Sequence, residues 1–441
     1  MNNNILTEPP AEENIVANWN PERGDLVSVC MLAYNHEPYL RDALNSVLNQ
    51  KTDFGFEILI HDDASQDASP IIIREYAARY PRIVKPILQS VNQHSQRIYP
   101  SVHFNYPRAN LPFVAMCEGD DYWTDENKLQ LQVDGLTAHP KINFSFHTAI
   151  LADYHEPGCP SRIFGDYDTK DTIVPFTDIM HRVRGMIPTA SSVIRQSAKV
   201  RFLDFLKSRP YLTVGDLYFQ FFGSAAEGAL YFARPMSLYR YRTEHSWTRK
   251  THLDKHFKAT HEMAMLRSYI ELDQLTGNIY HNEFVTLTLQ RLPWLFDSKA
   301  SPPSSLPGIA TLESIHKSCQ AEIERTLDQL GQTNARYVIY GSASGGRRIL
   351  DTLPSTKIAA VIDRDNHRVG ESMGGKPIIG VDSLHEYADC ELIVSTIAPN
   401  RALISELAAG AGIPGKAIHY IYDGALQFLD EHPIPTDIFE G

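Results

Sequence analysis

The sequence predicts an α/β protein with two Rossmann-like units joined by a helical segment, and three observations support this. Apolar runs typical of buried strands alternate with helical patterns between residues 26 and 116. The same alternation returns between residues 336 and 395. Strand–helix–strand order with buried strands implies right-handed crossovers and a parallel sheet. A Pro/Ser-rich break, SPPSSLPG at 301–308, interrupts the intervening helical stretch.

These patterns predict a five-part organisation along the chain. The polar, acidic N-terminus lacks the features of a signal peptide and is expected to be flexible. The predicted parts are a leader (1–24), a first α/β domain (25–250), a helical connector (251–333), a smaller second α/β domain (334–425) and a C-terminal tail (426–441).

Composition excludes some function classes. The 441 residues are 43% hydrophobic and 21% charged, as in ordinary globular proteins. A formal net charge of −12 argues against a nonspecific nucleic-acid binder. The five cysteines are scattered, with no Cys-x-x-Cys pair, which favours free thiols in a reducing compartment. No apolar run is long enough for a membrane span. We therefore expect a cytoplasmic protein, which leaves room for contact with a membrane surface.

The first domain is predicted from a series of strands and helices. Residues 26–33, 56–60, 113–117 and 141–151 read as strands, with a further strand-rich zone at 229–242. Periodicity predicts helices over 39–50, 69–80 and 124–139. Ligands of open parallel sheets bind beyond the carboxyl ends of the strands, so residues just after each strand are the candidate site residues.

Acidic residues occupy such positions. Asp62 and Asp63 follow the second strand, and Glu118, Asp120 and Asp121 follow the strand after it. Clustered carboxylates repel one another and lose hydration, so a fold gathers them where a cation or hydrogen-bond donors compensate. Mg²⁺ or Mn²⁺ bridging a diphosphate would supply that compensation.

Each acidic motif also has a purely structural interpretation. The run DDASQD at 62–67 suits a turn and helix N-cap, and taken alone we favour that role. Asp216, in VGDLYF, is equally a candidate N-cap or a candidate site residue. The segment EGDDYW at 118–123 is harder to explain by capping, because aromatic residues follow it at once.

A set of motifs in a fixed order favours a functional site over helix capping for these acidic residues. Residues from about Leu26 to Trp247 resemble the family 2 glycosyltransferases, which have the GT-A fold. The resemblance rests on five segments in the family's order: VSVCMLAYNHEPYLRDALNSVLNQ, ILIHDDASQD, FVAMCEGDDYWTDENKLQLQV, IPTASSVIR and VGDLYF. The third segment matches the subgroup that reads Glu-Gly-Asp-Asp-Tyr-Trp.

The resemblance implies roles for individual residues. Ala33 and Tyr34 would lie under the nucleotide of a nucleoside-diphosphate sugar. Asp63 would contact the base, Asp120 would approach the ribose, and Asp121 would hold the divalent metal on the diphosphate.

The resemblance also implies a chemical mechanism. Glu118 takes the first carboxylate slot of the metal motif. Asp216 would remove the proton from an acceptor hydroxyl while that oxygen attacks the anomeric carbon, with inversion. The sequence is thus expected to be a hexosyltransferase-type enzyme of polysaccharide biosynthesis, dependent on Mn²⁺ or Mg²⁺ and acting on a glycan or lipid-linked acceptor.

One departure from the family concerns the end of this domain. Family members commonly show Tyr-Arg-x-His there, and this chain has Arg242 in the histidine position. Either the Arg242 guanidinium binds the diphosphate, which we favour, or a loop shift brings His245 to the metal. An ordinary surface or packing role for His245 is the simpler alternative.

The second domain carries a glycine-rich turn. Gly341, Gly345 and Gly346 lie between a strand and a helix, and Asp363 follows 22 residues after Gly341. This layout resembles a dinucleotide-binding βαβ unit, with Ala343 in place of the middle glycine. The segment from about 336 to 422 resembles small Rossmann-like domains attached to sugar-modifying and polysaccharide-assembly enzymes.

Three functions of the second domain stay open at this point. It could bind a nucleotide, or serve as a packing or homo-oligomerisation module. It could also be the catalytic part of an NAD(P)-linked sugar oxidoreductase or epimerase, although no Tyr-x-x-x-Lys pair follows its third strand. A non-catalytic nucleotide-binding scaffold is the remaining alternative for the whole chain.

Overall fold

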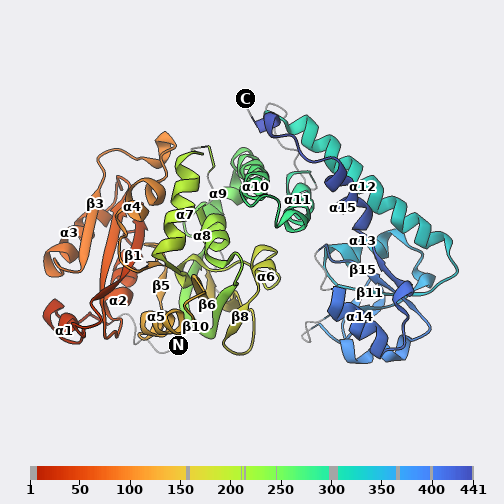
Figure 1. Ribbon diagram of the computed structural model, residues 1–441, viewed down its shortest axis with the longest axis horizontal. Coiled ribbons are helices and arrows are strands. Elements are labelled where there is room, and N and C mark those ends of the chain that lie inside the picture. Colours follow the sequence, from red (N-terminus) through yellow and green to blue (C-terminus); the bar gives the residue numbers. More distant parts are fainter. Residues whose placement is uncertain are drawn as a thin grey trace. The chain divides into compact units, whose positions relative to one another are not determined.

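A computed structural model of the chain divides into two compact units, Met1–Ala264 and Met265–Gly441 (Figure 1). The first unit therefore extends past the predicted domain end at 250. The residues that the structure describes are 7–154, 159–209, 211–212, 215–244, 246–296, 306–363, 368–397 and 401–439.

A twisted sheet of ten strands forms the centre of the first unit. Its strand order is β3-β2-β1-β4-β9-β6-β10-β5, with β7 beside β6 and β8 beside β10. Strands β3, β2, β1 and β4 are parallel, and β9 runs antiparallel to β4. The strands are β1 (Asp25–Ala33), β2 (Gly55–Asp62), β3 (Val84–Leu88), β4 (Phe113–Met116), β5 (Tyr122–Trp123), β6 (Phe144–Asp153), β7 (Arg162–Phe164), β8 (Thr172–Val174), β9 (Val193–Arg195) and β10 (Ala229–Tyr241).

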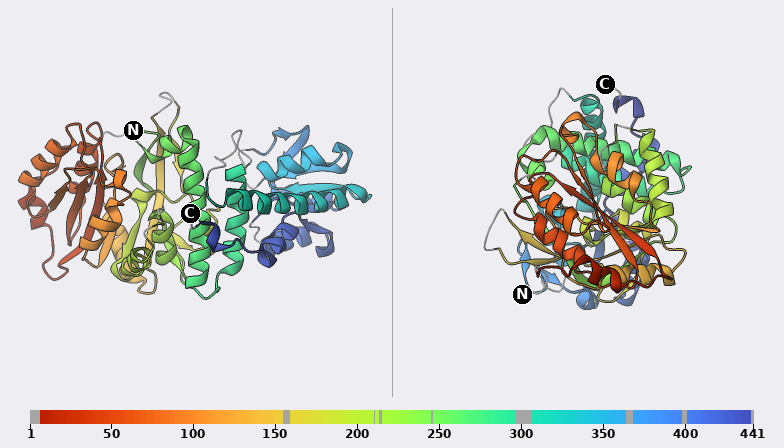
Figure 2. Two further views of the ribbon diagram at one scale, coloured as in Figure 1. Left: turned by 90° about the horizontal axis from the view of Figure 1, so that it is seen from above. Right: turned by 90° about the vertical axis from the view of Figure 1, so that its left-hand side faces the viewer.

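Helices cover this sheet, and the right-hand view of Figure 2 shows them beside the red strands. Helix α2 (Leu40–Leu48) buries one apolar face in the core of this unit and packs beside β5 and α3 (Ser69–Arg79), because Leu40, Leu44 and Val47 recur at helical spacing. The other helices are α4 (Tyr106–Arg108), α5 (Lys128–Ala138), α6 (Phe176–Met180), α7 (Gln196–Lys207), α8 (Gly215–Ser224) and α9 (Trp247–Leu253). Two short turns, η1 (His94–Gln96) and η3 (Thr189–Ser191), bear on the site described below.

Part of the segment expected to be a flexible leader folds onto the first unit. Helix α1 (Glu12–Ala17) buries Ile15, and its Glu12 carboxylate accepts the backbone amides of Arg82 (2.8 Å) and Ile83 (3.0 Å). Two carboxylate hydrogen bonds and a buried isoleucine fix this helix on the first unit. The polar composition of the segment did not predict that it would be fixed.

The second unit begins within α10 (Lys255–Leu275) and continues through α11 (His281–Phe296) and α12 (Ile309–Gln332). Its sheet has the order β13-β14-β12-β11-β15-β16, parallel except for β13. The strands are β11 (Tyr337–Tyr340), β12 (Ile358–Ile362), β13 (Ser372–Met373), β14 (Lys376–Ile379), β15 (Glu391–Val394) and β16 (Ile418–Tyr420); the helices are α13 (Ser344–Thr352), α14 (Arg401–Gly410) and α15 (Asp423–Glu431).

The α/β prediction is therefore confirmed for both units. In each, the strand order reverses beside the first strand, β1 or β11, which is the point where ligands of such sheets bind. Within the described residues, no helix has the length and apolar character needed to cross a membrane.

Candidate active site

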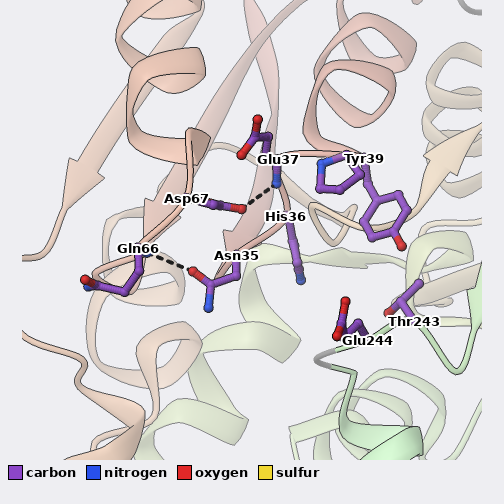
Figure 3. A pocket seen from close by; sticks show the side chains of 9 residues that line it. Asn35, His36, Glu37, Tyr39, Gln66, Asp67, Thr243 and Glu244 are labelled. Carbon is purple, nitrogen blue, oxygen red and sulfur yellow. Dashed lines mark hydrogen bonds between the residues drawn. The ribbon is translucent and has the colours of Figure 1, made fainter.

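The loops after β1 and β2 form one wall of the candidate site. The Asn35 amide donates to the Ser65 hydroxyl (2.9 Å), and the Gln66 amide donates to the Asn35 side chain (2.8 Å). The Glu37 amide donates to Asp67 (2.9 Å). These bonds fix the two loops to each other around a cavity of about 350 Å³ (Figure 3), lined by Asn35, His36, Glu37, Pro38, Tyr39, Gln66, Asp67, Thr243 and Glu244.

Asp63 lies beside this wall and organises a third loop. Its two carboxylate oxygens accept the amides of Gln93 (2.7 Å) and His94 (3.0 Å), and its own amide donates to Ala33 O (3.0 Å). An ionised carboxylate has about four acceptor positions, so one more donor can still bind. Contact of Asp63 with a nucleotide base stays a prediction, and its visible role is to hold the turn η1. Tyr34, predicted to lie under the nucleotide, is 39% exposed.

The predicted acidic residues after β4 influence one another's pKa, and Asp216 contributes to the effect on Glu118. Burial, followed by repulsion from Asp120 and Asp216, raises the pKa of Glu118 to about 8. Burial and then the charge of Asp120 raise the pKa of Asp121 well above its ordinary value. A charge raises the pKa of a carboxylate only from nearby, so Asp216, almost 100 residues further along the chain, lies near Glu118 in the structure.

One backbone and one side-chain hydrogen bond fix the orientation of Asp121 and Asp120. Asp121 Oδ1 accepts the amide of Arg240 (2.9 Å), and Asp120 Oδ2 accepts the Thr243 hydroxyl (3.0 Å). Between Glu118 and Asp120, Gly119 approaches β1 so closely that a Cβ would lie 2.7 Å from Leu32 O. Glycine is therefore required for the acidic segment to reach this position.

Asp216 stands in the first turn of α8. Its side chain is exposed, and desolvation by the surrounding protein raises its pKa. The positive charge of Arg182 and a 3.3 Å hydrogen bond from the Thr189 hydroxyl act in the opposite direction. An accessible carboxylate with a raised pKa is suited to accept a proton.

Two arginines near the end of β10 have different roles. Arg242, predicted to bind phosphate, has φ +61° and directs its guanidinium at both oxygens of Asp153. Arg240, which sequence reasoning missed, is 3% exposed and donates to Asp120 O (2.8 Å) and to Asp42. Arg240 thus braces the acidic segment, whereas phosphate binding by Arg242 stays a prediction. His245 lies outside the described residues.

The acidic group is suited to share a divalent metal with a phosphate ligand. Within the described ranges, no three His, Cys, Asp or Glu side chains converge closely enough to enclose an ion. Mg²⁺-type ions in nucleotide sites commonly need only one or two carboxylates, because phosphates and water supply the other ligands. Asp121 has one oxygen bound to Arg240 N, and the mutual repulsion of Glu118 and Asp120 would be relieved by a cation. The residues therefore fit a metal held jointly with a diphosphate.

The glycine turn of the second unit is tightly packed. Gly341 has φ +111°, and a Cβ on Gly345 would lie 2.1 Å from Ser395 O. A Cβ on Gly346 would lie 2.2 Å from Gly341 O. These glycines are explained by the close approach of α13 to β11 and β15, whether or not a ligand binds there.

Asp363, the predicted ribose ligand of this unit, is already engaged. The Ser342 hydroxyl donates to Asp363, and the Arg368 guanidinium lies 3.7 Å from the same carboxylate. Arg368 also donates to the Ser342 hydroxyl (2.6 Å). The three side chains form a polar group beside the glycine turn.

Comparison with known proteins shows what part of the first unit is similar to. Residues 28–194 match the family Glycosyl transferase family 2. An uncharacterized protein of Mycobacterium tuberculosis is 45% identical over 125 residues, which are 27% of this chain and 34% of that protein. The abequosyltransferase RfbV of Salmonella typhimurium is 25% identical over 297 residues, or 62% of this chain and 83% of that one.

Among solved structures, S. aureus TarS residues 1–349 match with a TM-score of 0.43 and 15% identity, covering 74% of this chain and 83% of that chain. The chain spans about a third of the length of the first curated relatives. The family match agrees with the sheet order and with the acidic residues beyond β4. The first unit therefore has a GT-A type Rossmann-like fold, in which residues 28–194 match Glycosyl transferase family 2.

Proposed function

We propose that this chain is a metal-dependent, inverting glycosyltransferase that moves a sugar, of the hexosyl type, from a nucleoside-diphosphate sugar to a hydroxyl of a glycan or lipid-linked acceptor. The observation that carries the proposal is that Glu118, Asp120 and Asp121 follow β4 beside the point where the strand order reverses, and that Asp216 raises the pKa of Glu118 from nearby. A family 2 domain with an intact acidic group supports a working enzyme over a decayed scaffold.

The donor binds at the carboxyl ends of β1, β2 and β4. Ala33 and Tyr34 support the nucleotide, Asp63 holds the neighbouring turn and faces the base, and Asp120 bonds the ribose. Asp121 holds Mn²⁺ or Mg²⁺, with Glu118 nearby. When bound, the metal stabilises the negative charge that develops on the departing diphosphate.

Asp216 acts on the acceptor. Its carboxylate accepts the proton of the acceptor hydroxyl while that oxygen forms a bond to the anomeric carbon. The bond from the anomeric carbon to the diphosphate oxygen breaks in the same displacement, so the configuration inverts. The raised pKa of Asp216 brings it closer to neutral pH and so makes it a stronger base than an ordinary aspartate.

For the rest of the chain we propose simpler roles. The second unit binds a nucleotide beside Gly341 or mediates homo-oligomer formation; the Ser342–Asp363–Arg368 group favours the first. We place the enzyme in the cytoplasm, at the membrane surface when its acceptor is lipid-linked. The naming of one relative as an abequosyltransferase is in keeping with a role in surface polysaccharide synthesis.

A thermal-shift screen of nucleotide sugars with and without Mn²⁺ tests the proposal, since a ligand of the native state raises its apparent stability. The donor that binds is then used in a hydrolysis and transfer assay. Asp121→Ala is expected to abolish turnover, and its retention of full activity would refute the proposal. Titration with NAD(P)H tests the oxidoreductase alternative, for which binding at the second unit is required.

A further inference from the structure

A buried tryptophan connects the acidic segment to the opposite side of the site. Trp123 lies two residues after Asp121 and is fully buried. Its indole Nε1 donates to the carbonyl of Ala190 (2.9 Å), and its backbone amide donates to the Ser46 hydroxyl (3.1 Å). Ala190 is the central residue of the turn η3. The indole therefore ties this turn to the segment that holds Asp121.

A second contact holds the same turn. The side-chain amide of Gln132 donates to Ser191 O (2.9 Å) and to the Ser145 hydroxyl (3.1 Å). The Lys128 amino group donates to Gln132 Oε1 (2.7 Å) and lies 4.1 Å from the centre of the Trp123 ring. Because Lys128 occupies the carbonyl oxygen of the amide, the NH₂ group must point toward η3.

Burying these two polar side chains costs folding free energy that a purely packed core would not need to spend. Lys128 and Gln132 are both fully buried, and burial lowers the pKa of Lys128 to about 7. An apolar cluster of the same volume would pack as well without this desolvation cost. What the polar groups add is a fixed position for the backbone of η3.

The turn η3 carries the residue that contacts Asp216. Thr189, next to Ala190, donates its hydroxyl to Asp216 Oδ2 (3.3 Å). A chain of bonds therefore runs from the acidic segment through Trp123 and η3 to the carboxylate on α8. The two carboxylates with different chemical tasks, Asp121 and Asp216, are joined by protein contacts that involve neither substrate.

We infer that Trp123, Lys128 and Gln132 are positioning residues, which hold η3 so that Thr189 orients and tunes Asp216 relative to the donor. The inference rests on the proposed function, in which Asp216 is the general base. The Thr189 hydroxyl favours the ionised form of Asp216, so its loss would make the base available only at higher pH.

The test compares pH–rate profiles of transfer, with the donor found by the thermal-shift screen. Thr189→Val is expected to lower kcat about tenfold near neutral pH, with donor KM within about twofold of wild type. The acidic limb of the Thr189→Val pH–rate profile moves to higher pH, and kcat of this variant recovers in part at alkaline pH. Thr189→Ser, which keeps the hydroxyl, restores the wild-type profile. Thr286→Val, in the second unit, is the matched control and leaves the profile unchanged.

Trp123→Phe removes the indole donor and keeps a ring in the core. We expect it to move the acidic limb in the same direction as Thr189→Val, while Trp294→Phe, at an exposed position, does not. If Trp123→Phe fails to fold, the threonine series decides alone. A wild-type profile for Thr189→Val, or for a folded Trp123→Phe, overturns the inference. Wild-type turnover by Asp216→Asn would instead overturn the proposed function, so the two failures are distinguishable.

Discussion

Replacement of Glu118 by glutamine should change how the stability of the protein depends on pH. Burial and the charges of Asp120 and Asp216 raise the pKa of Glu118 from 4.5 to about 8. The native state therefore retains a proton that the unfolded chain releases. Stability falls as pH rises from the unfolded to the folded value, because ionisation is easier in the unfolded chain. The glutamine side chain of Glu118→Gln does not ionise, so this variant does not lose stability through ionisation at position 118.

The size of the effect follows from the two pKa values. Between pH 5 and pH 8 the ionisation of Glu118 lowers the free energy of unfolding of the wild type by at most about 3.5 kcal/mol. The Glu118 side chain is partly accessible to solvent, which screens the charges and reduces the expected effect to about 1–2 kcal/mol. Relative to wild type, Glu118→Gln should gain this much free energy of unfolding when the pH is raised from 5 to 8.

Urea denaturation in the presence of a chelator measures this difference. Wild type, Glu118→Gln and the control Glu13→Gln, at an exposed position on α1, are compared at pH 5, 6.5 and 8. The control should run parallel to wild type. If Glu118→Gln also runs parallel to wild type across this range, the acidic group is not as crowded as the structure indicates, and the electrostatic argument for a cation site fails.

Three further predictions concern the metal and the second unit. Removal of divalent metal by EDTA should abolish glycosyl transfer, and added Mn²⁺ should restore it; chelator-resistant transfer would contradict the metal proposal. Gly345→Ala should lower the free energy of unfolding by about 2–4 kcal/mol by urea titration, because the new Cβ would meet Ser395 O at 2.1 Å. His281 bonds Asp273 and Asp430, which raise its pKa in that order. Its stabilising contribution is full below pH 6.5 and is lost as pH rises through the raised value, so wild type but not His281→Gln should show this loss in thermal melts.

The parallel strands could be predicted from the sequence because apolar residues occupy them almost without interruption. Strands β1, β2, β4, β11, β12 and β15 were all expected, and each is buried on both faces. The folding of α1 onto the first unit was not expected, since one isoleucine and two long-range hydrogen bonds leave no periodic pattern.

Site residues could be predicted from the sequence where they directly follow a strand. The acidic residues after β4 were found in this way. The distinct roles of Arg240 and Arg242 were not, because strand alternation places residues two apart on the same face. Strand β10 ends at Tyr241, and the left-handed backbone at Arg242 turns that side chain to Asp153. Such a local change of backbone direction depends on tertiary contacts that the sequence does not reveal.

The indole of Trp123 is buried in the core close to the acidic segment. The structure shows a packed ring that also donates a hydrogen bond to Ala190, a residue 67 positions away in sequence. No local pattern predicts a partner at that distance, although a tryptophan two residues after a pair of aspartates was a signal for a role beside the acidic segment.

The central claim is that Asp121 holds the donor through a metal and that Asp216 acts only on the acceptor. Calorimetric titration of the donor into wild type, Asp121→Asn and Asp216→Asn, each with and without Mn²⁺, tests this division most directly. The account predicts that Asp121→Asn loses the Mn²⁺-dependent part of donor binding, whereas Asp216→Asn binds donor like wild type and yet transfers no sugar. Mn²⁺-dependent donor binding by Asp121→Asn at wild-type affinity would contradict it.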